Sequence, residues 1–412
     1  MPKIKLPYHL IEKFHLGGKI KILSKKIKNQ KDLSLAYTPG VAQICKKIVE
    51  NPEKIFTLTS KRNSVAVMTD GTAVLGLGNI GAKASIPVME GKSQLFKSFA
   101  DIDAWVVAIE NVHNTNGKTD VAKFVDVASK IAVSYGGINL EDIAAPECFE
   151  IERILDNELD IPVFHDDQWG TAIISLAAIE NYLLITGKSS SIKIVINGAG
   201  AAGIRIADLL KASGIKNITL CDRNGVISHL RDDLNEHKKR HAVYSDQKTL
   251  KDAMKDADIF IGVSSKDLVN EDMILSMNEY PGIFAMANPD PEIDPDRVKK
   301  CMEGRKYIMA TGRSDFPNQI NNVLGFPYIF KGALDVFAKT ITLNMKIKAA
   351  KTLASIARDQ HIPDIVKKAY KRDFVFGNQY LIPTPFDPRL NLLVSKEVSK
   401  QAIDDDVARK FI

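Results

Sequence analysis

The stretch that decides the fold is IKIVINGAGAAG, residues 192–203. Its apolar first half is typical of a buried strand, and the Ala-, Ile- and Leu-rich residues after it are typical of a helix. The glycines of this GxGxxG pattern permit a tight turn and let backbone N–H groups approach a pyrophosphate at a helix N-terminus. The stretch therefore predicts a dinucleotide-binding turn. Its expected cofactor contacts are Gly198, Gly200, Ala201, Ala202 and Gly203.

An acidic residue follows this motif at the spacing that a dinucleotide site needs. Asp222 lies 19 residues after Gly203 and ends the next expected strand, residues 217–221. A carboxylate there accepts hydrogen bonds from an adenosine ribose and repels a 2′-phosphate, so it favours NAD. The next residue, Arg223, is able to pair with a 2′-phosphate instead, which keeps NADP open.

A second GxGxxG, residues 76–81, lacks the same context. Pro87 is expected to interrupt the helix that should follow it, because proline lacks the N–H of the helical ladder. Asp101 precedes the next strand instead of ending it. We interpret these glycines as close backbone packing or a substrate-side loop.

Apolar runs and helical patterns alternate on both sides of the first motif, which predicts an α/β protein. From residue 192 onward, the expected strands are 192–197, 217–221, 257–263, 283–287 and 307–310, and the expected helices are 201–213, 247–256 and 270–277. The elements expected before it are strands 65–68, 104–109, 138–140 and 162–164, and helices 119–134 and 170–186. We predict a mixed α/β N-terminal domain (1–165), a doubly wound Rossmann-type dinucleotide-binding domain (166–385) and a C-terminal helical segment packing back on the body (386–412).

Composition and charge exclude several protein classes. The 412 residues, 45% hydrophobic and 26% charged, argue against a disordered, collagen-like or coiled-coil chain. No uncharged apolar run reaches the ~18 residues of a membrane span. The net charge of +6 is uneven, since residues 1–31 hold nine lysines and one acid (9 − 1 = +8), leaving −2 for the rest.

The basic N-terminal segment has no arginine and no apolar stretch of the kind that targeting peptides need. A lysine-rich surface explains it better than a nucleic-acid-binding arm does, although the second reading stays open. The four cysteines lie at least 73 residues apart and form no zinc or CxxC pattern. They indicate a reducing, cytoplasmic compartment.

Two acidic pairs each follow an apolar strand: Glu141-Asp142 and Asp166-Asp167. If they converge at one rim of a sheet, their mutual repulsion calls for a cation, and oxygen ligands suit Mg²⁺ or Mn²⁺. Neighbours on an extended chain point to opposite faces, so the chain must leave β geometry if both members of a pair are ligands. The alternative is that these acids are surface groups or helix caps, with Asp167 capping a helix that begins near Gly170.

Two further residues are candidates for acid–base chemistry. Lys92 lies beside a glycine in an apolar stretch, unlike the N-terminal lysines, and Tyr37 lies at a turn before a helix. Lysine acts as a general base only where its pKa falls from ~10.4 to about 7–8. Ordinary core or surface roles remain open for both residues.

At this point the sequence resembles the malic enzymes, above all their short bacterial and archaeal branch. The similarity runs in order from about His15 to Arg389. The matching segments are 32–42, 69–71, 76–81, 89–92, 139–142, 165–168 and 318–322.

The resemblance implies oxidative decarboxylation of (S)-malate to pyruvate and CO₂ with reduction of NAD or NADP, and decarboxylation of oxaloacetate. It implies dependence on Mg²⁺ or Mn²⁺, and a cytoplasmic homodimer without nucleic-acid or membrane partners. Matched motif by motif, Lys92 would take the C2 hydroxyl proton and Tyr37 would protonate C3. The residues with other implied roles are Glu141, Asp142 and Asp167 (metal ligands), Asp166 (behind them), Thr171, Val263 and Ser264 (cofactor), Asn288 (cofactor and substrate) and Asn321 (substrate).

The sequence departs from the family pattern in two places. Trp169 stands where relatives often have histidine, and Thr72-Ala73 stand where the longer branch has an arginine. The cation that binds the C4 carboxylate is therefore unassigned, with Arg313 and Lys97 as candidates. Three alternative functions stay open: a malolactic-type reaction that retains its cofactor, a non-catalytic dinucleotide sensor, and a polyanion-binding protein.

Overall fold

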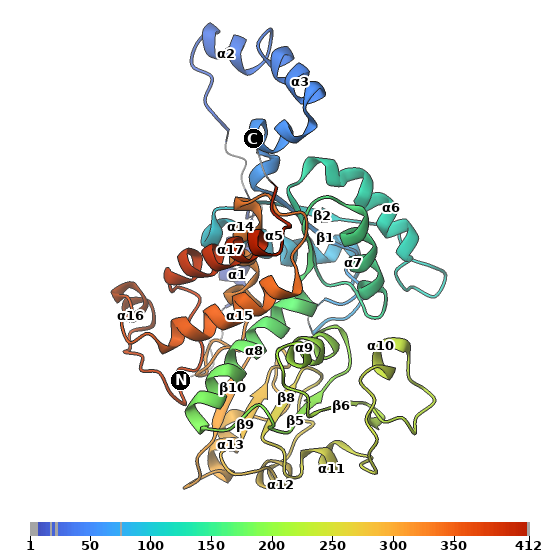
Figure 1. Cartoon of the computed structure of the whole chain (residues 1–412), viewed down its shortest axis with the longest axis vertical. Helices are drawn as coiled ribbons and strands as arrows, with labels where there is room; N and C mark the ends of the chain where they lie inside the picture. The colour runs from blue at the N-terminus through green and yellow to red at the C-terminus, as the bar shows by residue number, and fades with distance from the viewer. Residues whose placement is uncertain (1–6, 17–18, 21–23, 75, 410–412) are drawn as a thin grey trace.

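The computed structural model describes residues 7–16, 19–20, 24–74 and 76–409, and contains one parallel and one mainly parallel sheet joined by a long helix (Figure 1). The first sheet is four-stranded and parallel throughout, in the order β2-β1-β3-β4. Its strands are β1 (Ser64–Thr69), β2 (Asp103–Ala108), β3 (Gly137–Leu140) and β4 (Val163–His165). The helices between them are α5 (Gly81–Ala100), α6 (Val121–Ile131) and α7 (Glu147–Glu158).

The second sheet is six-stranded, in the order β10-β9-β8-β5-β6-β7, and only β7 runs antiparallel. Its strands are β5 (Ile194–Asn197), β6 (Ile218–Asp222), β7 (Gly225–Val226), β8 (Ile259–Gly262), β9 (Gly282–Ala285) and β10 (Ile308–Thr311). Its helices are α9 (Ala201–Ala212), α10 (Glu236–Lys239), α11 (Leu250–Met254), α12 (Glu271–Leu275) and α13 (Pro295–Cys301). Strands β6 and β8 lie on opposite sides of β5, so the direction of the strand order reverses at β5. Such a reversal opens a crevice at the carboxyl end of β5, as the Rossmann-type prediction requires.

Helix α8 (Asp166–Thr186) leaves β4 directly and runs between the two sheets, where it packs against α9 and α15 (Figure 1). It is long and apolar enough for a membrane span, but most of it is buried, so it is a core helix of this fold. The C-terminal helix α17 packs against α14 and α15. The bounds of the C-terminal helices are α14 (Phe326–Asp335), α15 (Leu343–Arg358), α16 (Asp364–Tyr370) and α17 (Ser395–Asp404).

Two expectations from the sequence are wrong here. Helix α5 continues through Pro87, which lies on its exposed face, where the carbonyl of Lys83 that loses its helical partner can bond to water. The buried face of α5 includes Met89 and Phe96, and that packing offsets the lost hydrogen bond. Helix α8 begins at Asp166 and not near Gly170, because the helix dipole favours acidic residues in a first turn.

The N-terminal segment contains α1 (Tyr8–His15), α2 (Gln30–Ala36), α3 (Val41–Glu50) and α4 (Ile55–Leu58). Helices α2 and α3 form a hairpin that extends away from the rest of the protein (Figure 1), and neither buries a residue. Its exposed apolar side chains are Leu33, Leu35, Tyr37, Val41 and Val49. The four cysteines are free in the structure.

Candidate functional site

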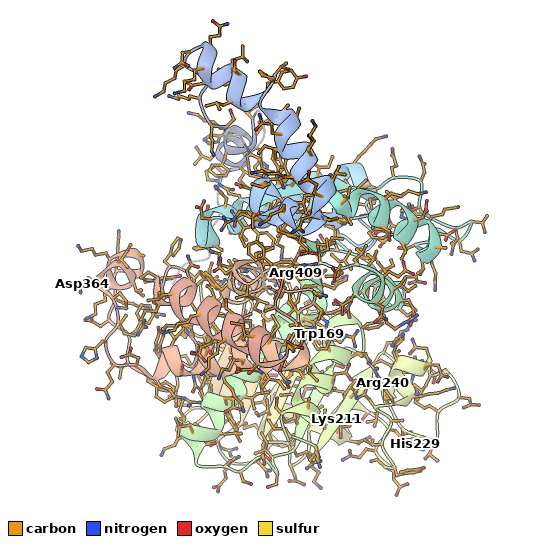
Figure 2. The ribbon with its side chains drawn as sticks, turned by 45° about the horizontal axis from the view of Figure 1, so that its top comes forward. Trp169, Lys211, His229, Arg240, Asp364 and Arg409 are labelled. Carbon is orange, nitrogen blue, oxygen red and sulfur yellow. The ribbon has the colours of Figure 1, made fainter. Side chains whose placement is uncertain are left out.

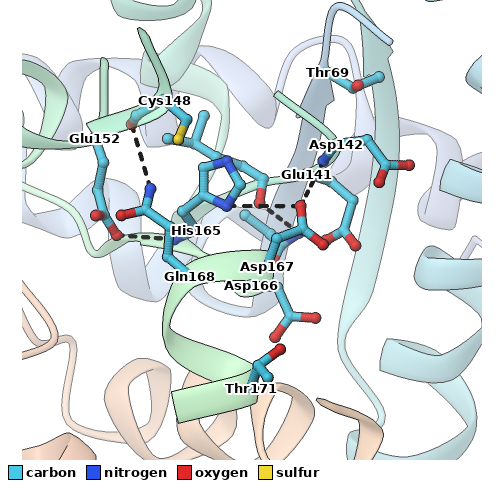
Figure 3. A network of polar contacts seen from close by, with 12 residues as sticks. Thr69, Glu141, Asp142, Cys148, Glu152, His165, Asp166, Asp167, Gln168 and Thr171 are labelled. Carbon is cyan, nitrogen blue, oxygen red and sulfur yellow. Dashed lines mark hydrogen bonds and ion pairs between the residues drawn. The ribbon is translucent and has the colours of Figure 1, made fainter. Parts of the chain in front are cut away.

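The two acidic pairs converge at the carboxyl edge of the first sheet (Figure 3). Glu141 and Asp142 follow β3, while Asp166 and Asp167 form the first turn of α8. One oxygen each from Glu141, Asp142 and Asp167 lies within 4.8 Å of the other two. The two acidic pairs therefore lie together, which is one of the two arrangements that the sequence left open.

The backbone leaves β geometry at Asp142, as the ligand hypothesis required. Its φ of 52° places it in the left-handed region. In that conformation its N–H donates to Asp167 Oδ2 over 2.8 Å, while its carbonyl accepts from Ala73 N over 2.9 Å. The turn thus brings Glu141 and Asp142 to the same group of carboxylates instead of to opposite faces.

The cluster holds more negative charge than the protein around it neutralises. Burial, and then the neighbouring carboxylates, raise the pKa of Glu141 and of Asp142. Asp142 Oδ2 and Asp166 Oδ1 are buried without a hydrogen-bond partner among the described residues. Orphaned carboxylate oxygens in an all-oxygen set fit a hard divalent cation such as Mg²⁺ or Mn²⁺.

Lys92 reaches this cluster from the middle of α5. Its Nζ lies 2.8 Å from Glu141 Oε1 and 2.5 Å from Asp166 Oδ2, and 4.4 Å from the centre of the Phe326 ring. Burial by itself lowers the pKa of Lys92, but the carboxylates of Asp166 and Glu141 more than offset it, so the pKa is raised. Without a cation, Lys92 is therefore an ammonium group.

Asn322, a residue that the sequence reasoning missed, holds Asp166 in place. Its Nδ2 donates to Asp166 Oδ2 over 3.0 Å, and its Oδ1 accepts from Thr171 Oγ1 over 3.1 Å. Asn321, the predicted substrate ligand, accepts a hydrogen bond from Val323 N through its Oδ1 at the start of a short 3₁₀ turn, and its role toward substrate stays a prediction. The pair Asn321-Asn322 was the only indication of this contact in the sequence, and the sequence does not tell which of the two faces the cluster.

Tyr37 is not brought to the carboxylate cluster within one chain. It follows α2 in the projecting hairpin, and 68% of its surface is exposed. The cluster itself lies in the interior, where Glu141 and Asp142 are each 4% exposed.

The predicted dinucleotide turn has the expected geometry. Gly198 has a φ of 120°, and a Cβ there would lie 2.5 Å from the carbonyl oxygen of Val263; one at Gly203 would lie 1.7 Å from the carbonyl oxygen of Gly198. Gly200 is the N-cap of α9, so Ala201 and Ala202 form its first turn. A pocket of about 180 Å³ adjoins this turn, with Phe149, His237 and Lys238 in its wall.

Other parts of the cofactor crevice are connected by hydrogen bonds. Asn197 Nδ2 donates to Ser264 Oγ over 2.9 Å. Buried Glu292, which the sequence reasoning missed, accepts from the backbone N–H groups of Ser264 (3.0 Å) and Ala287 (3.1 Å). It thereby connects the segments that follow β8 and β9, which contain Val263 and Asn288.

The loop with the second GxGxxG packs on the same crevice. A Cβ at Gly76 would lie 3.2 Å from Pro289 Cδ, and one at Gly312 would lie 2.8 Å from Asn288 Nδ2. The close-packing interpretation therefore agrees with the structure at Gly76, but not at Gly78 or Gly81, where an added Cβ would meet nothing within 4 Å.

The carboxylate of Asp222 is paired with two basic side chains. Its Oδ1 lies 2.8 Å from Arg231 Nη1 and its Oδ2 lies 2.6 Å from Lys238 Nζ. These hydrogen bonds, offsetting the effect of burial, lower the pKa of the Asp222 carboxyl. Arg223, the cation that the sequence suggested, is exposed. The cations that pair with Asp222 are Arg231 and Lys238, which were not predicted from the sequence.

The two candidates for the C4 carboxylate differ in their location. The prediction that Lys97 binds the C4 carboxylate is wrong. Lys97 pairs with Asp101 and with Asp103, the first residue of β2, and therefore lies at the edge of the sheet opposite the acidic cluster. Arg313 follows β10 at a carboxyl edge, where it pairs with Asp315 over 2.5 Å.

Comparison with known proteins matches both halves of the chain. The profile for "Malic enzyme, N-terminal domain" covers residues 17–156, and that for "Malic enzyme, NAD binding domain" covers 169–367. A probable NADP-dependent malic enzyme of Rickettsia prowazekii is 52% identical over 98% of this chain, which spans only 52% of that protein's length. An NAD-dependent malic enzyme of Geobacillus stearothermophilus is 45% identical over 96% of this chain and 79% of its own length. The crystal structure of a Pyrococcus horikoshii malic enzyme superposes with a TM-score of 0.86 at 39% identity, covering 98% of this chain and 92% of that one.

Proposed function

This chain belongs to the malic enzyme family, and from that premise we propose that it oxidises and decarboxylates (S)-malate to pyruvate and CO₂, reducing NAD or NADP. The observation that carries the proposal is the cluster of Glu141, Asp142 and Asp167, in which the first two are buried and the third is partly buried, and which Lys92 contacts through Glu141. The dinucleotide turn lies at the start of α9, which packs against the helix that begins at this cluster.

The proposal gives each group of residues a separate task. A divalent cation bound by the three carboxylates would polarise the C2 oxygen of malate as a Lewis acid and, by opposing their charge, lower the pKa of Lys92. Lys92 Nζ would accept the C2 hydroxyl proton, and a nicotinamide held at the dinucleotide turn would supply the acceptor for the C2 hydride. Tyr37 donates a proton to C3 of the enol that remains after CO₂ is lost. Decarboxylation of added oxaloacetate would use the same residues.

We propose that NADP is accepted alongside NAD. The preference for NAD rests on repulsion between Asp222 and a 2′-phosphate, but Arg231 and Lys238 offset that charge. Lys238 also lines the pocket beside the dinucleotide turn, where its ammonium group can pair with a phosphate. The preference for NAD over NADP remains a prediction.

We further propose that the protein acts as a homodimer, in which Tyr37 serves the site of the second copy. The support is the exposure of Tyr37 on a hairpin that buries none of its own residues, while the side chain of Lys92 is only 11% exposed. A monomer would leave five exposed apolar residues of that hairpin in water, and a second copy would cover them. The C2 symmetry usual for dimers would give both sites a tyrosine at once.

A spectrophotometric assay tests the proposed reaction. Malate is incubated with NAD or NADP and with Mn²⁺, Mg²⁺ or EDTA, while nicotinamide reduction and pyruvate are both measured. We expect equal amounts of reduced cofactor and pyruvate, and loss of both in EDTA. Lactate without net reduced cofactor would favour the malolactic-type reaction, and dinucleotide binding without turnover would favour a sensor.

A further inference from the structure

Arg205 connects the dinucleotide helix to the acidic cluster without touching a metal ligand. It lies on α9, two residues after the last glycine of the turn, and its side chain is 15% exposed. Its Nε donates to Gln168 Oε1 over 2.8 Å, and its Nη2 lies 3.3 Å from Glu152 Oε2. Both partners belong to elements that pack around β4 and the start of α8.

Those two partners fix the chain on either side of Asp166 and Asp167. Glu152 Oε1 accepts from the backbone N–H of His165 over 3.0 Å, just before the acidic pair. Gln168 Nε2 donates to the carbonyl of Cys148 over 3.3 Å, just after the pair (Figure 3). The turn that presents Asp166 and Asp167 is therefore held at both ends by residues that Arg205 contacts.

The guanidinium group of Arg205 is also stacked between aromatic rings. It lies 4.6 Å from the centre of the Trp169 ring and 5.1 Å from that of Phe149. The buried ammonium group of Lys346 lies 4.0 Å from the centre of the same Trp169 ring. This stack joins four helices, because Phe149 lies in α7, Trp169 in α8, Arg205 in α9 and Lys346 in α15. Figure 2 labels Trp169 near the centre of its view. A planar guanidinium makes such stacks and two directed hydrogen bonds at once, which an ammonium group does not.

We propose that Arg205 is a positioning residue that couples dinucleotide binding at α9 to the placement of Asp166 and Asp167. A pyrophosphate bound at the start of α9 orders the helix that carries Arg205, and Arg205 in turn holds the turn that carries the acidic pair. This inference rests on the proposed metal site and dinucleotide turn. Residues that orient metal ligands typically change metal affinity about 10- to 100-fold when they are lost.

The test is the Mn²⁺ dissociation constant of the full-length protein, measured by titration calorimetry with and without NADP and in the absence of malate. Arg205→Met should weaken Mn²⁺ binding about 10- to 100-fold and remove the tightening that NADP gives the wild type. Arg205→Lys should fall between the two, because it keeps the charge but loses the fork of hydrogen bonds.

The matched control is Arg240→Met. Arg240 pairs with Asp208 over 2.8 Å, as Arg205 does over 3.1 Å, but its side chain is 44% exposed and has no contact with Gln168 or Glu152 among the described residues. It should leave Mn²⁺ affinity unchanged. Gln168→Met replaces Arg205→Met if the latter fails to fold by circular dichroism, and should show the same loss.

An Mn²⁺ dissociation constant within twofold of wild type in a folded Arg205→Met protein would overturn the proposal. So would an equal loss in Arg240→Met, or wild-type affinity that NADP does not change. Malate turnover by the wild type is measured separately. Its absence would refute the proposed function while leaving the Mn²⁺ comparison decisive for Arg205.

Discussion

Lys92 Nζ and Asp166 Oδ2 lie 2.5 Å apart, which places the proposed base in direct contact with the acidic pair that begins α8. The contact joins the middle of α5 to the first turn of α8. A change at Lys92 should therefore affect proton transfer first, because the proposed metal ligands Glu141, Asp142 and Asp167 come from other elements and would remain in place.

Lys92→Ala should lower kcat about 10²- to 10⁴-fold, as loss of a general base usually does. Steady-state kinetics with saturating Mn²⁺ measure the effect. Lys97→Ala is the control, since Lys97 lies on the same helix but at its far end, and should keep wild-type kcat. A near-normal kcat in Lys92→Ala would mean that this lysine has only a structural role.

Asp167→Ala should abolish malate oxidation and oxaloacetate decarboxylation together, because both need the same cation. The variant also loses the acceptor of the Asp142 backbone N–H, so the turn at Asp142 should loosen. The two activities are assayed separately on one preparation. Asp126→Asn, at an exposed carboxylate of α6, is the control. Oxaloacetate decarboxylation at the wild-type rate in Asp167→Ala would contradict the ligand assignment.

Mixing two inactive variants tests whether Tyr37 acts across the dimer. Tyr37→Phe and Lys92→Ala should each be nearly inactive alone. If the tyrosine comes from the other copy, a mixed dimer has one site with both groups intact, and an equal mixture regains about a quarter of wild-type activity. Subunits are exchanged by dilution and reconcentration before the assay. A mixture that stays as inactive as its parents would place Tyr37 and Lys92 in the same chain's site.

Thermal stability should depend on pH and metal together. Burial, and then Asp167, raise the pKa of Asp142 from 3.8 to about 8, so the folded state holds a proton that the unfolded chain releases between these values. Without metal, this contribution to stability is present below about pH 4 and is lost as the pH rises towards 8. A cation needs the ionised carboxylates, so Mn²⁺ should raise Tm more near pH 8 than near pH 6.

Differential scanning fluorimetry with Mn²⁺ or EDTA at the two pH values measures this difference. Asp126→Asn should behave like the wild type. The same rise in Tm with Mn²⁺ at both pH values would contradict the proposal that Asp142 is protonated near pH 6 when no metal is bound.

Lys238→Ala should lower kcat/KM for NADP about tenfold more than for NAD, because a charged hydrogen bond to the 2′-phosphate is lost. Lys239→Ala is the control, since Lys239 is exposed and pairs with Glu236 on its own helix. Equal losses with both cofactors would mean that Lys238 positions Asp222 or the pocket wall and does not bind the 2′-phosphate.

Local signals predicted the central features of this protein. The glycine turn before α9 and the two acidic pairs were recognisable because each is a short motif directly after an apolar strand. Even the departure of Asp142 from β geometry followed from the requirement that neighbouring acids face one cation.

Long-range contacts explain what the sequence did not predict. Pro87 remains within α5 because one face of that helix is packed into the core, which no local pattern reports. Asn322, Arg231 and Lys238 gained their roles only when the fold placed them beside Asp166 and Asp222. The location of Lys97 likewise depends on which end of α5 meets the acidic edge.

The hairpin of α2 and α3 also has a kinetic consequence. If Tyr37 serves the site of a second copy, as proposed, specific activity depends on enzyme concentration, with a lag on mixing and a decline on dilution. The association constant between copies then enters the rate law itself, so progress curves recorded at low enzyme concentration would report assembly as well as chemistry.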